Sequence, residues 1–343
     1  MLTVQNLTKN FDKNRVLNSI SFSVKQEEIL ALIGPSGCGK TTTLRLIAGF
    51  EQADSGRIEL MGKCLAGENY IVPPEKRNIG FVFQNYALFP HLTVIENVAF
   101  GLKNLPKVKR LKKAENLLEM VQLSDFRYRK THDLSGGEQQ RVALARSIGP
   151  NPKLILLDEP FSSLDAELRE STRKEVHQLL RSFNMSAILV THDQEEALSF
   201  ADKLAVMHEG EIEQIGPPEL IYRKPQTQFV SIFLGKSNII DGIADGCQVR
   251  TKIGSLQIAT ENFGPVCVSI RPEHLVMKKP NGGCLGTIRK RDFKGHDMTY
   301  QVVFDEYQCS VQTSYDCQFR VGQHVELQAI ESAVIIPKGK NGD

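Results

Sequence analysis

The chain has 343 residues, of which 41% are hydrophobic and 24% charged, and its 42 basic residues nearly balance 40 acidic ones. This length suggests two domains, and the composition excludes disordered and collagen-like proteins. A net charge of +2 gives no general electrostatic reason to bind nucleic acid or lipid. The longest apolar runs fall far short of the roughly 20 residues that span a bilayer, and the first residues carry no apolar targeting stretch. We therefore expect a chain that does not cross a membrane by itself.

The seven cysteines are odd in number and include no C-x-x-C pair. The eight histidines form no cluster with them at the spacing of metal ligands. We therefore expect reduced thiols in a cytosolic protein, without a disulfide framework or a structural metal site. The cysteines stand at positions 38, 64, 247, 267, 284, 309 and 317.

Residues 1–235 alternate short apolar runs with longer amphipathic stretches. Three runs are apolar without alternation, which is typical of parallel strands buried on both faces, and they lie at 29–33, 154–157 and 187–190. A helical pattern follows each of them, at 42–48, 166–182 and 194–200. Strands that alternate with helices predict an α/β layer around a parallel sheet.

Two further regions differ from these in residue composition and spacing. Residues 102–121 are rich in lysine and carry Leu and Val at helical spacing, which predicts a solvated amphipathic helix. They contain no interleaved aromatic residues, so we expect no nucleic-acid binding there. From about residue 235, short β-branched segments are separated by Gly, Pro, Asn and Asp clusters, and they lie at 248–253, 266–270, 300–304 and 324–330. This spacing predicts a small all-β barrel or sandwich.

The segment from Gly34 to Thr41 matches the pattern G-x-x-x-x-G-K-[ST], between an apolar run and a helical pattern. Glycines let the backbone turn successive N–H groups toward an anion, and the new helix adds its positive N-terminal end. Lys40 supplies a charge to the β- and γ-phosphates, and the Thr41 hydroxyl is a ligand for Mg²⁺. The candidate nucleotide-binding residues are Gly34, Pro35, Ser36, Gly37, Cys38, Gly39, Lys40, Thr41 and Thr42.

Polar residues also end the other two apolar runs. Asp158 can reach a hydrated Mg²⁺ beside the phosphates, whereas Glu159 can point elsewhere and polarise the attacking water. The simpler alternative is an acidic turn before Pro160. His192 ends the run at 187–190, and a neutral imidazole there can hydrogen-bond a γ-phosphate oxygen. Because open α/β sheets bind ligands at the carboxyl ends of their strands, we expect these side chains to meet at one edge.

The segment Leu134–Arg141, LSGGEQQR, contains the S-x-x-E pattern of a helix capping box. Its glycines, Gly136 and Gly137, are poor helix formers but let bare backbone and a helix N-terminus approach a phosphate. The eight residues resemble the signature of the ATP-binding-cassette (ABC) ATPases. Together with the phosphate loop and the Asp-Glu strand, this segment makes the chain similar to that family over essentially its whole length.

The resemblance implies roles for other residues. Gln84, in the segment FVFQN, is similar to the glutamine that senses Mg²⁺ and faces the membrane partner. Ser162–Asp165, SSLD, is similar to the loop that crosses the dimer interface, where Asp165 helps to link two sites. Phe11 lies where the family stacks an aromatic ring on adenine, although a core phenylalanine is the alternative. Ser163 departs from the alanine that is frequent at its position, and we expect this departure to have little effect.

For the fold, the resemblance implies a P-loop NTPase cassette over residues 1–235, with a helical subdomain at about 85–150. A small all-β regulatory domain, OB-like and of the TOBE type, would cover 236–343 and contain the segment SIRPEH. The implied function is the ATP-hydrolysing subunit of a bacterial solute importer. Residues 48–56 and 88–97 look most like the ferric-iron import ATPases, while polyamine, sulfate, sugar and other anion importers share much of the pattern. A soluble ABC ATPase of nucleic-acid repair or translation is the remote alternative.

In this family two cassettes close head to tail, so that Ser135, Gly136 and Gly137 of one would act on ATP held by the other. The implied partners are a second copy of the chain, two transmembrane permease subunits that contact residues 84–96, and an external solute-binding protein, with no nucleic acid. The chain would lie peripherally on the cytoplasmic face of the inner membrane. The implied cofactors are ATP and Mg²⁺, with Thr41, Gln84 and Asp158 as metal ligands and with Glu159, His192 and Gln84 as catalytic residues.

Cys38 has an unusual position for a thiol. It lies inside the phosphate loop, near a helix N-terminus and Lys40, and both features favour a thiolate. This predicts that Cys38 is alkylated readily without nucleotide and is protected by ATP. The alternative is an inert small residue.

Overall fold

The computed structural model describes residues 1–68, 70–314 and 319–337, and it divides into two compact units, Met1–Pro218 and Glu219–Asp343. Within the described ranges, no helix is long and apolar enough to cross a bilayer. Cys38, Cys64, Cys247, Cys284 and Cys309 are not joined in disulfides, and Cys317 lies outside the described residues.

The central sheet of the first unit has the strand order β11-β10-β3-β9-β8-β7. The strands from β10 to β7 are parallel, and β11 pairs antiparallel at one edge. The three apolar runs are strands β3, β8 and β9, which confirms the predicted parallel sheet. The bounds are β3 Ile29–Ile33, β7 Ile79–Val82, β8 Leu154–Asp158, β9 Ser186–Thr191, β10 Lys203–His208 and β11 Glu211–Gly216.

A second, antiparallel sheet has the order β2-β1-β4-β5-β6, and the sequence did not predict it. Its strands are β1 Leu2–Phe11, β2 Asn14–Val24, β4 Ser55–Leu60, β5 Lys63–Gly67 and β6 Tyr70–Ile71. Helix α1, Lys40–Ala48, buries Leu44 and Ile47 in one apolar core with residues of both sheets. In β3, Leu30 belongs to this core and Ile29 to the core on the opposite face. Apolar residues therefore fill every position of the strand.

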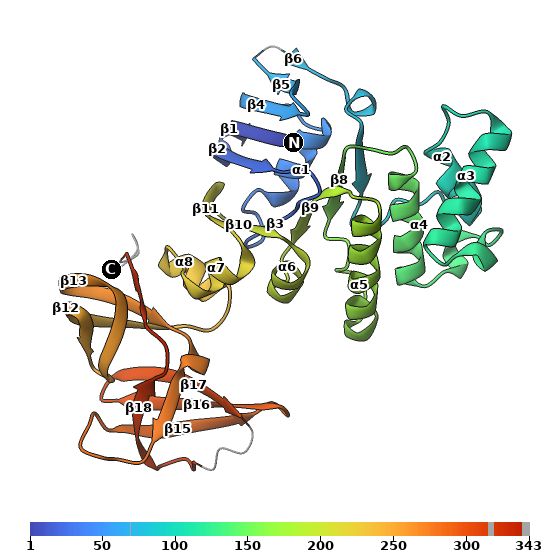
Figure 1. The fold of residues 1–343 in the computed structure, drawn as a ribbon. Coiled ribbons are helices and arrows are strands. Elements are labelled where there is room, and N and C mark those ends of the chain that lie inside the picture. The colour runs from blue at the N-terminus through green and yellow to red at the C-terminus, as the bar shows by residue number, and fades with distance from the viewer. Residues whose placement is uncertain (69, 315–318, 338–343) are drawn as a thin grey trace. The chain divides into compact units, whose positions relative to one another are not determined.

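Helices cover the other face of the central sheet. Figure 1 shows α4 beside α5 and beside the α2–α3 pair. The predicted helices at 166–182 and 194–200 are confirmed as α5 and α6. The lysine-rich helix begins only after Pro106, which lacks an N–H and fits a helix start. The bounds are α2 Val94–Phe100, α3 Lys107–Met120, α4 Gly136–Ile148, α5 Ala166–Ser182 and α6 Gln194–Phe200.

The second unit is built on two antiparallel sheets, β12-β13-β19 and β14-β18-β15-β16-β17, which share one apolar core. This confirms the predicted all-β fold. The strands are β12 Asn238–Thr251, β13 Gly254–Ile270, β14 Leu275–Lys278, β15 Gly286–Phe293, β16 Asp297–Phe304, β17 Tyr307–Ser314, β18 His324–Ala329 and β19 Val334–Ile336.

The division between the units falls at Pro218, ahead of residue 236, because two short helices belong with the β-rich unit. These are α7, Pro218–Arg223, and α8, Gln228–Phe233. The buried Arg271 donates hydrogen bonds to the main-chain oxygens of Tyr222 at 3.0 Å and Ser231 at 2.8 Å. Its guanidinium also lies 4.0 Å from the centre of the Tyr222 ring. The arginine of the segment SIRPEH thus fixes both helices to the strands.

Candidate functional site

The phosphate loop connects β3 to α1, and its glycines serve different purposes. Gly37 and Gly39 have positive φ angles of 83° and 103°, a region that side chains disfavour. A Cβ atom on Gly34 would lie 2.2 Å from the main-chain oxygen of Met207 in β10, so that glycine is needed for close packing. A Cβ atom on Gly37 would meet no atom within 4 Å, which leaves its outer side open to a ligand.

Lys40 is 6% exposed and folds back over the loop. Its Nζ donates to the main-chain oxygens of Gly34 at 2.7 Å and Pro35 at 2.9 Å. The ammonium group therefore already lies at the centre of the loop, held by carbonyl oxygens.

The phosphate loop and the Asp-Glu strand meet at Thr41 and Asp158. The Thr41 hydroxyl donates a 3.0 Å hydrogen bond to Asp158 Oδ1. Burial raises the pKa of Asp158, and the hydrogen bond from Thr41 opposes this increase. The predicted metal ligands from α1 and β8 are thus brought together, and both offer the oxygen atoms that Mg²⁺ prefers.

The three predicted catalytic residues meet on one carboxylate oxygen. Glu159 Oε2 accepts a hydrogen bond from Gln84 Nε2 at 3.3 Å and lies 3.2 Å from His192 Nδ1. Glu159 has a positive φ of 44°, and its N–H donates to Val190 O at 2.9 Å, which continues the pairing of β8 with β9. A left-handed backbone at a non-glycine residue costs roughly 1–3 kcal/mol. This strain turns the Glu159 side chain toward the end of β9.

The signature segment forms the capping box that its sequence pattern predicts. Ser135 precedes α4, and its N–H donates to Glu138 Oε2 at 2.7 Å, while the Glu138 N–H donates to Ser135 Oγ at 3.4 Å. A Cβ atom on Gly136 would lie 2.8 Å from Leu164, and one on Gly137 would lie 3.0 Å from Thr172 Oγ1. The glycines therefore also let α4 approach Leu164 and α5. The predicted capping box at Ser135 and Glu138 is confirmed within the single chain.

Two further predicted residues are Asp165 and Phe11. Asp165 caps α5 by accepting a 2.9 Å hydrogen bond from the Leu168 N–H. Phe11 ends β1 with 42% of its surface exposed, and Lys9 Nζ lies 4.8 Å from the centre of its ring. The exposed ring contradicts the core alternative for Phe11 and agrees with a residue that is available for stacking.

A sequence model described as "ABC transporter" matches residues 17–162. A spermidine/putrescine import ATP-binding protein, PotA, from Mesoplasma florum is 44% identical over 304 residues, which are 86% of this chain and 86% of that protein. This chain belongs to the ABC transporter family. An Fe(3+) ions import ATP-binding protein, FbpC 2, from Haemophilus influenzae is 40% identical over 341 residues, 95% of this chain and 94% of that protein.

A solved ABC structure covers the first unit. The dimeric cassette MJ0796, in a post-hydrolysis state with ADP and Pi, is 30% identical, with a TM-score of 0.56 over 64% of this chain and 99% of that one. The chain is thus an import ATP-binding subunit with a P-loop NTPase cassette and a further all-β part, as predicted.

The family sequence pattern did not identify every residue that shapes this site. Ser162 Oγ donates to Glu159 O at 2.9 Å and lies 3.4 Å from Gln84 Nε2. Thr191 Oγ1 donates to Glu196 Oε2 at 2.6 Å beside His192. The two hydroxyl contacts join residues three and five positions apart, whereas the approach of Ser162 to Gln84 joins residues 78 positions apart and depends on how distant segments pack.

The predicted thiolate at Cys38 of the ABC subunit is wrong. Burial raises the pKa of the Cys38 thiol and outweighs the nearby Lys40 charge, and the residue is 5% exposed. Its Sγ lies 3.8 Å from Lys40 Nζ, inside the loop. Two effects therefore act together against alkylation, a low thiolate fraction and poor access.

We now expect Cys38 to react with iodoacetamide at least about tenfold more slowly than the exposed Cys247, at pH 7.5 and without nucleotide. Mass spectrometry of the two cysteine peptides over time measures both rates in one sample. Equal rates at the two cysteines would contradict the buried thiol.

The ABC subunit also carries a buried carboxyl in α6, four residues after His192. Glu196 is 3% exposed, and burial raises its pKa to about 7, while the Thr191 hydrogen bond opposes this increase. In the unfolded chain the pKa is close to 4.5. Below pH 4.5 the carboxyl is protonated in the folded and the unfolded chain, and its ionisation does not lower the free energy of unfolding. Above pH 7 it is ionised in both, and it lowers the free energy of unfolding most.

We therefore expect Glu196→Gln to raise the free energy of unfolding at pH 8 by up to about 3 kcal/mol, and to have little effect near pH 4.5. Denaturant unfolding at a series of pH values measures this difference. The exposed Glu195 in the same helical turn supplies the control, since Glu195→Gln removes a charge without burial. A stabilisation that does not change with pH would contradict the buried ionisation.

Proposed function

We propose that this chain hydrolyses ATP at the site around Glu159 and that this hydrolysis drives import of a solute. The observation that carries the proposal is the convergence of Gln84 and His192 on one oxygen of Glu159. A carboxylate held by two neighbours is oriented to take a proton from an attacking water. Lys40 and the loop N–H groups would bind the phosphates, and the exposed ring of Phe11 would stack on adenine.

Mg²⁺ fits the residues present, since Thr41 Oγ1 and Asp158 Oδ1 are 3.0 Å apart and Gln84 adds an amide oxygen. When bound, the ion supplies charge neutralisation for the β- and γ-phosphates. The chain's own part is to hold these oxygens on α1, β8 and the segment after β7.

A second copy of the chain completes the proposed site. Ser135 and the glycines after it lie at the N-terminus of α4, and the hydrogen bonds of Ser135 remain within its own capping box. In a head-to-tail dimer this helix end would meet the γ-phosphate held by the other copy. The similar MJ0796 cassette, which is dimeric with ADP and Pi bound, supports a dimer.

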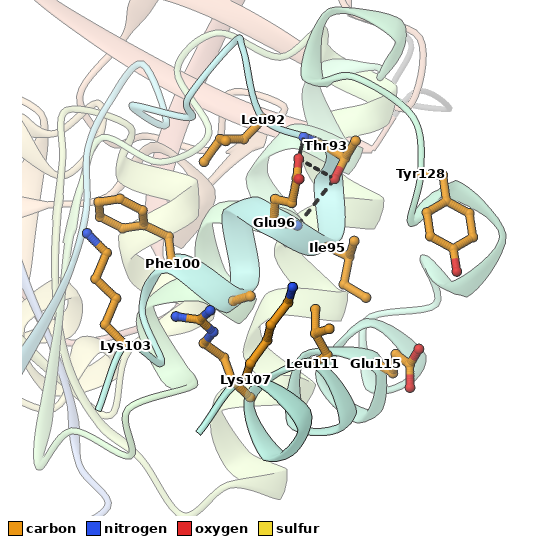
Figure 2. A pocket seen from close by; sticks show the side chains of 12 residues that line it. Leu92, Thr93, Ile95, Glu96, Phe100, Lys103, Lys107, Leu111, Glu115 and Tyr128 are labelled. Atoms are coloured by element: carbon orange, nitrogen blue, oxygen red, sulfur yellow. Dashed lines mark hydrogen bonds between the residues drawn. The ribbon is translucent and has the colours of Figure 1, made fainter. Parts of the chain in front are cut away.

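The permease subunits would dock on two hollows that flank residues 84–96. One is a groove of about 670 Å³ lined by Phe83, Ala87, Phe89 and Arg146 among others. The other has about 500 Å³ and lies between α2 and α3, where Figure 2 shows Phe100, Lys107 and Tyr128 around it. Aromatic and apolar linings with a few charges are typical of interface cores. Such docking would hold the chain peripherally at the cytoplasmic face of the inner membrane, with a solute-binding protein on the far side.

For the cargo we propose ferric iron, because the FbpC 2 match spans 95% of this chain and 94% of that protein, whereas the PotA match from Bacteroides fragilis spans 95% of this chain and only 71% of that protein. A polyamine is the second candidate, because the PotA-type match has the higher identity, 44%. Sulfate, sugar and other anions follow, and the soluble nucleic-acid class has no support among these relatives.

Uptake of radiolabelled ferric iron beside spermidine, sulfate and maltose tests the cargo in cells that lack the chain. We expect loss of iron uptake alone, restored by the wild type and not by Glu159→Gln. Loss of spermidine uptake with intact iron uptake would replace iron by a polyamine and would leave the ATPase mechanism in place.

A further inference from the structure

Tyr86 has a strained backbone conformation and belongs to the apolar core that the helices α2 to α5 share with the central sheet. It is 5% exposed, its φ is 60°, and the φ of the next residue, Ala87, is 45°. A left-handed conformation costs a non-glycine residue about 1–2 kcal/mol, so two in succession need support from their surroundings.

Arg146 of α4 supplies that support. Its Nη2 donates to Tyr86 O at 2.8 Å and its Nη1 donates to Ala87 O at 2.7 Å. One guanidinium therefore holds both strained carbonyls. Arg146 and Ala87 also line the groove of about 670 Å³ that we assign to the permease. The conformation of Tyr86 is thus tied to this groove and to the helix that follows Ser135.

The side chain of Tyr86 reaches the loop after β8. Its hydroxyl forms a 2.7 Å hydrogen bond with Ser163 Oγ. The neighbouring Ser162 Oγ donates to Glu159 O at 2.9 Å. Ser163 thus makes a contact that the sequence did not indicate. Alanine there would remove this partly buried hydrogen bond of the Tyr86 hydroxyl.

We propose that Tyr86 and Ser163 are positioning residues for ATP hydrolysis. Their shared hydrogen bond fixes the position of the segment from Glu159 to Ser163 relative to the groove that we assign to the permease. The inference rests on the proposed ATPase function. Neither residue touches the nucleotide in this scheme. Both act through Glu159, so removing their contact lowers the rate of the chemical step and leaves ATP binding unchanged.

A double-mutant cycle on ATP hydrolysis by the full chain tests the contact. We expect Tyr86→Phe and Ser163→Ala each to lower kcat about three- to tenfold, with the KM for ATP within about twofold of the wild type. The double variant should be no slower than the slower single variant, because both changes remove the same hydrogen bond. Ser163→Thr keeps a hydroxyl and should retain most of the rate.

Two controls separate positioning from a general loss of structure. Ser171 in α5 is exposed, and its hydroxyl donates to Leu168 O, so Ser171→Ala should leave kcat unchanged. In a Glu159→Gln background, Ser163→Ala should change the residual rate by less than about twofold, because the residue through which it acts is gone.

Three results would overturn this inference without touching the proposed function. The first is a normal kcat in Ser163→Ala, and the second is an equal loss of kcat in Ser163→Thr and Ser163→Ala. The third is a loss in the double variant that equals the product of the two single losses. If the wild-type chain does not hydrolyse ATP, or hydrolyses it equally well after Glu159→Gln, the proposed function fails, and this inference fails with it.

Discussion

Glu159→Gln should bind ATP, accumulate as a closed dimer and hydrolyse ATP about 100-fold or more slowly than the wild type. Glutamine keeps the size of the side chain and can still pair with Gln84 and His192, but it cannot accept the proton of the attacking water. Loss of general-base catalysis typically costs about 10²–10⁴-fold in rate. Because ATP binding persists while turnover stops, the ATP-bound dimer has no fast route to reopen.

Steady-state ATP hydrolysis measures the rate, and size-exclusion chromatography with MgATP measures the dimer. Glu167→Gln is the matched control, since Glu167 is exposed in the first turn of α5. Hydrolysis by Glu159→Gln within a few-fold of the wild type would show that another group takes the proton.

Gly34→Ala should destabilise the first unit by about 3 kcal/mol and should abolish measurable ATP binding. The new Cβ would lie 2.2 Å from the main-chain oxygen of Met207 and 2.7 Å from Cys38 Sγ. A main-chain oxygen in the central sheet cannot move aside cheaply, so the phosphate loop must move instead. Overpacking of this kind typically costs about 1–3 kcal/mol, and a clash with backbone falls at the upper end.

Gly37→Ala is the matched comparison in the same loop. Its Cβ would meet nothing within 4 Å, so the change carries only the cost of a φ of 83°. That cost is about 1–2 kcal/mol. Urea unfolding of the two variants measures the difference in stability, and titration with ATP measures binding. Equal losses in both variants would mean that the close approach of β10 adds no cost at position 34.

The contiguous motifs of this chain were predictable because their chemistry is local. The phosphate loop, the Asp-Glu strand and the capping box each occupy fewer than ten successive residues, and each folds as the sequence indicates. The strands β3, β8 and β9 were predictable for a related reason. They are buried on both faces, so apolar residues fill every position and the run is continuous.

The antiparallel sheet was not predictable in this way. The pairing of β1 with β2 is irregular at three places between Val4 and Asn10, and each irregularity breaks the alternation of apolar and polar residues. The β1–β4 pairing joins residues about 50 positions apart, which no local pattern reports. The short helices α7 and α8 likewise belong to the second unit because of Arg271, far along the chain.

The sequence by itself determined the family, the phosphate loop and the identity of the groups that Gln84, Glu159 and His192 bring to the site. Only the tertiary structure decided that these three side chains meet at Glu159 Oε2, because they come from segments joined through the parallel pairing of β7, β8 and β9. The burial that raises the pKa of Cys38 was equally invisible in the sequence, which showed the charge of Lys40 and not the surrounding core. The residue types of a site follow from the chain, whereas their distances and their solvation depend on packing between remote segments.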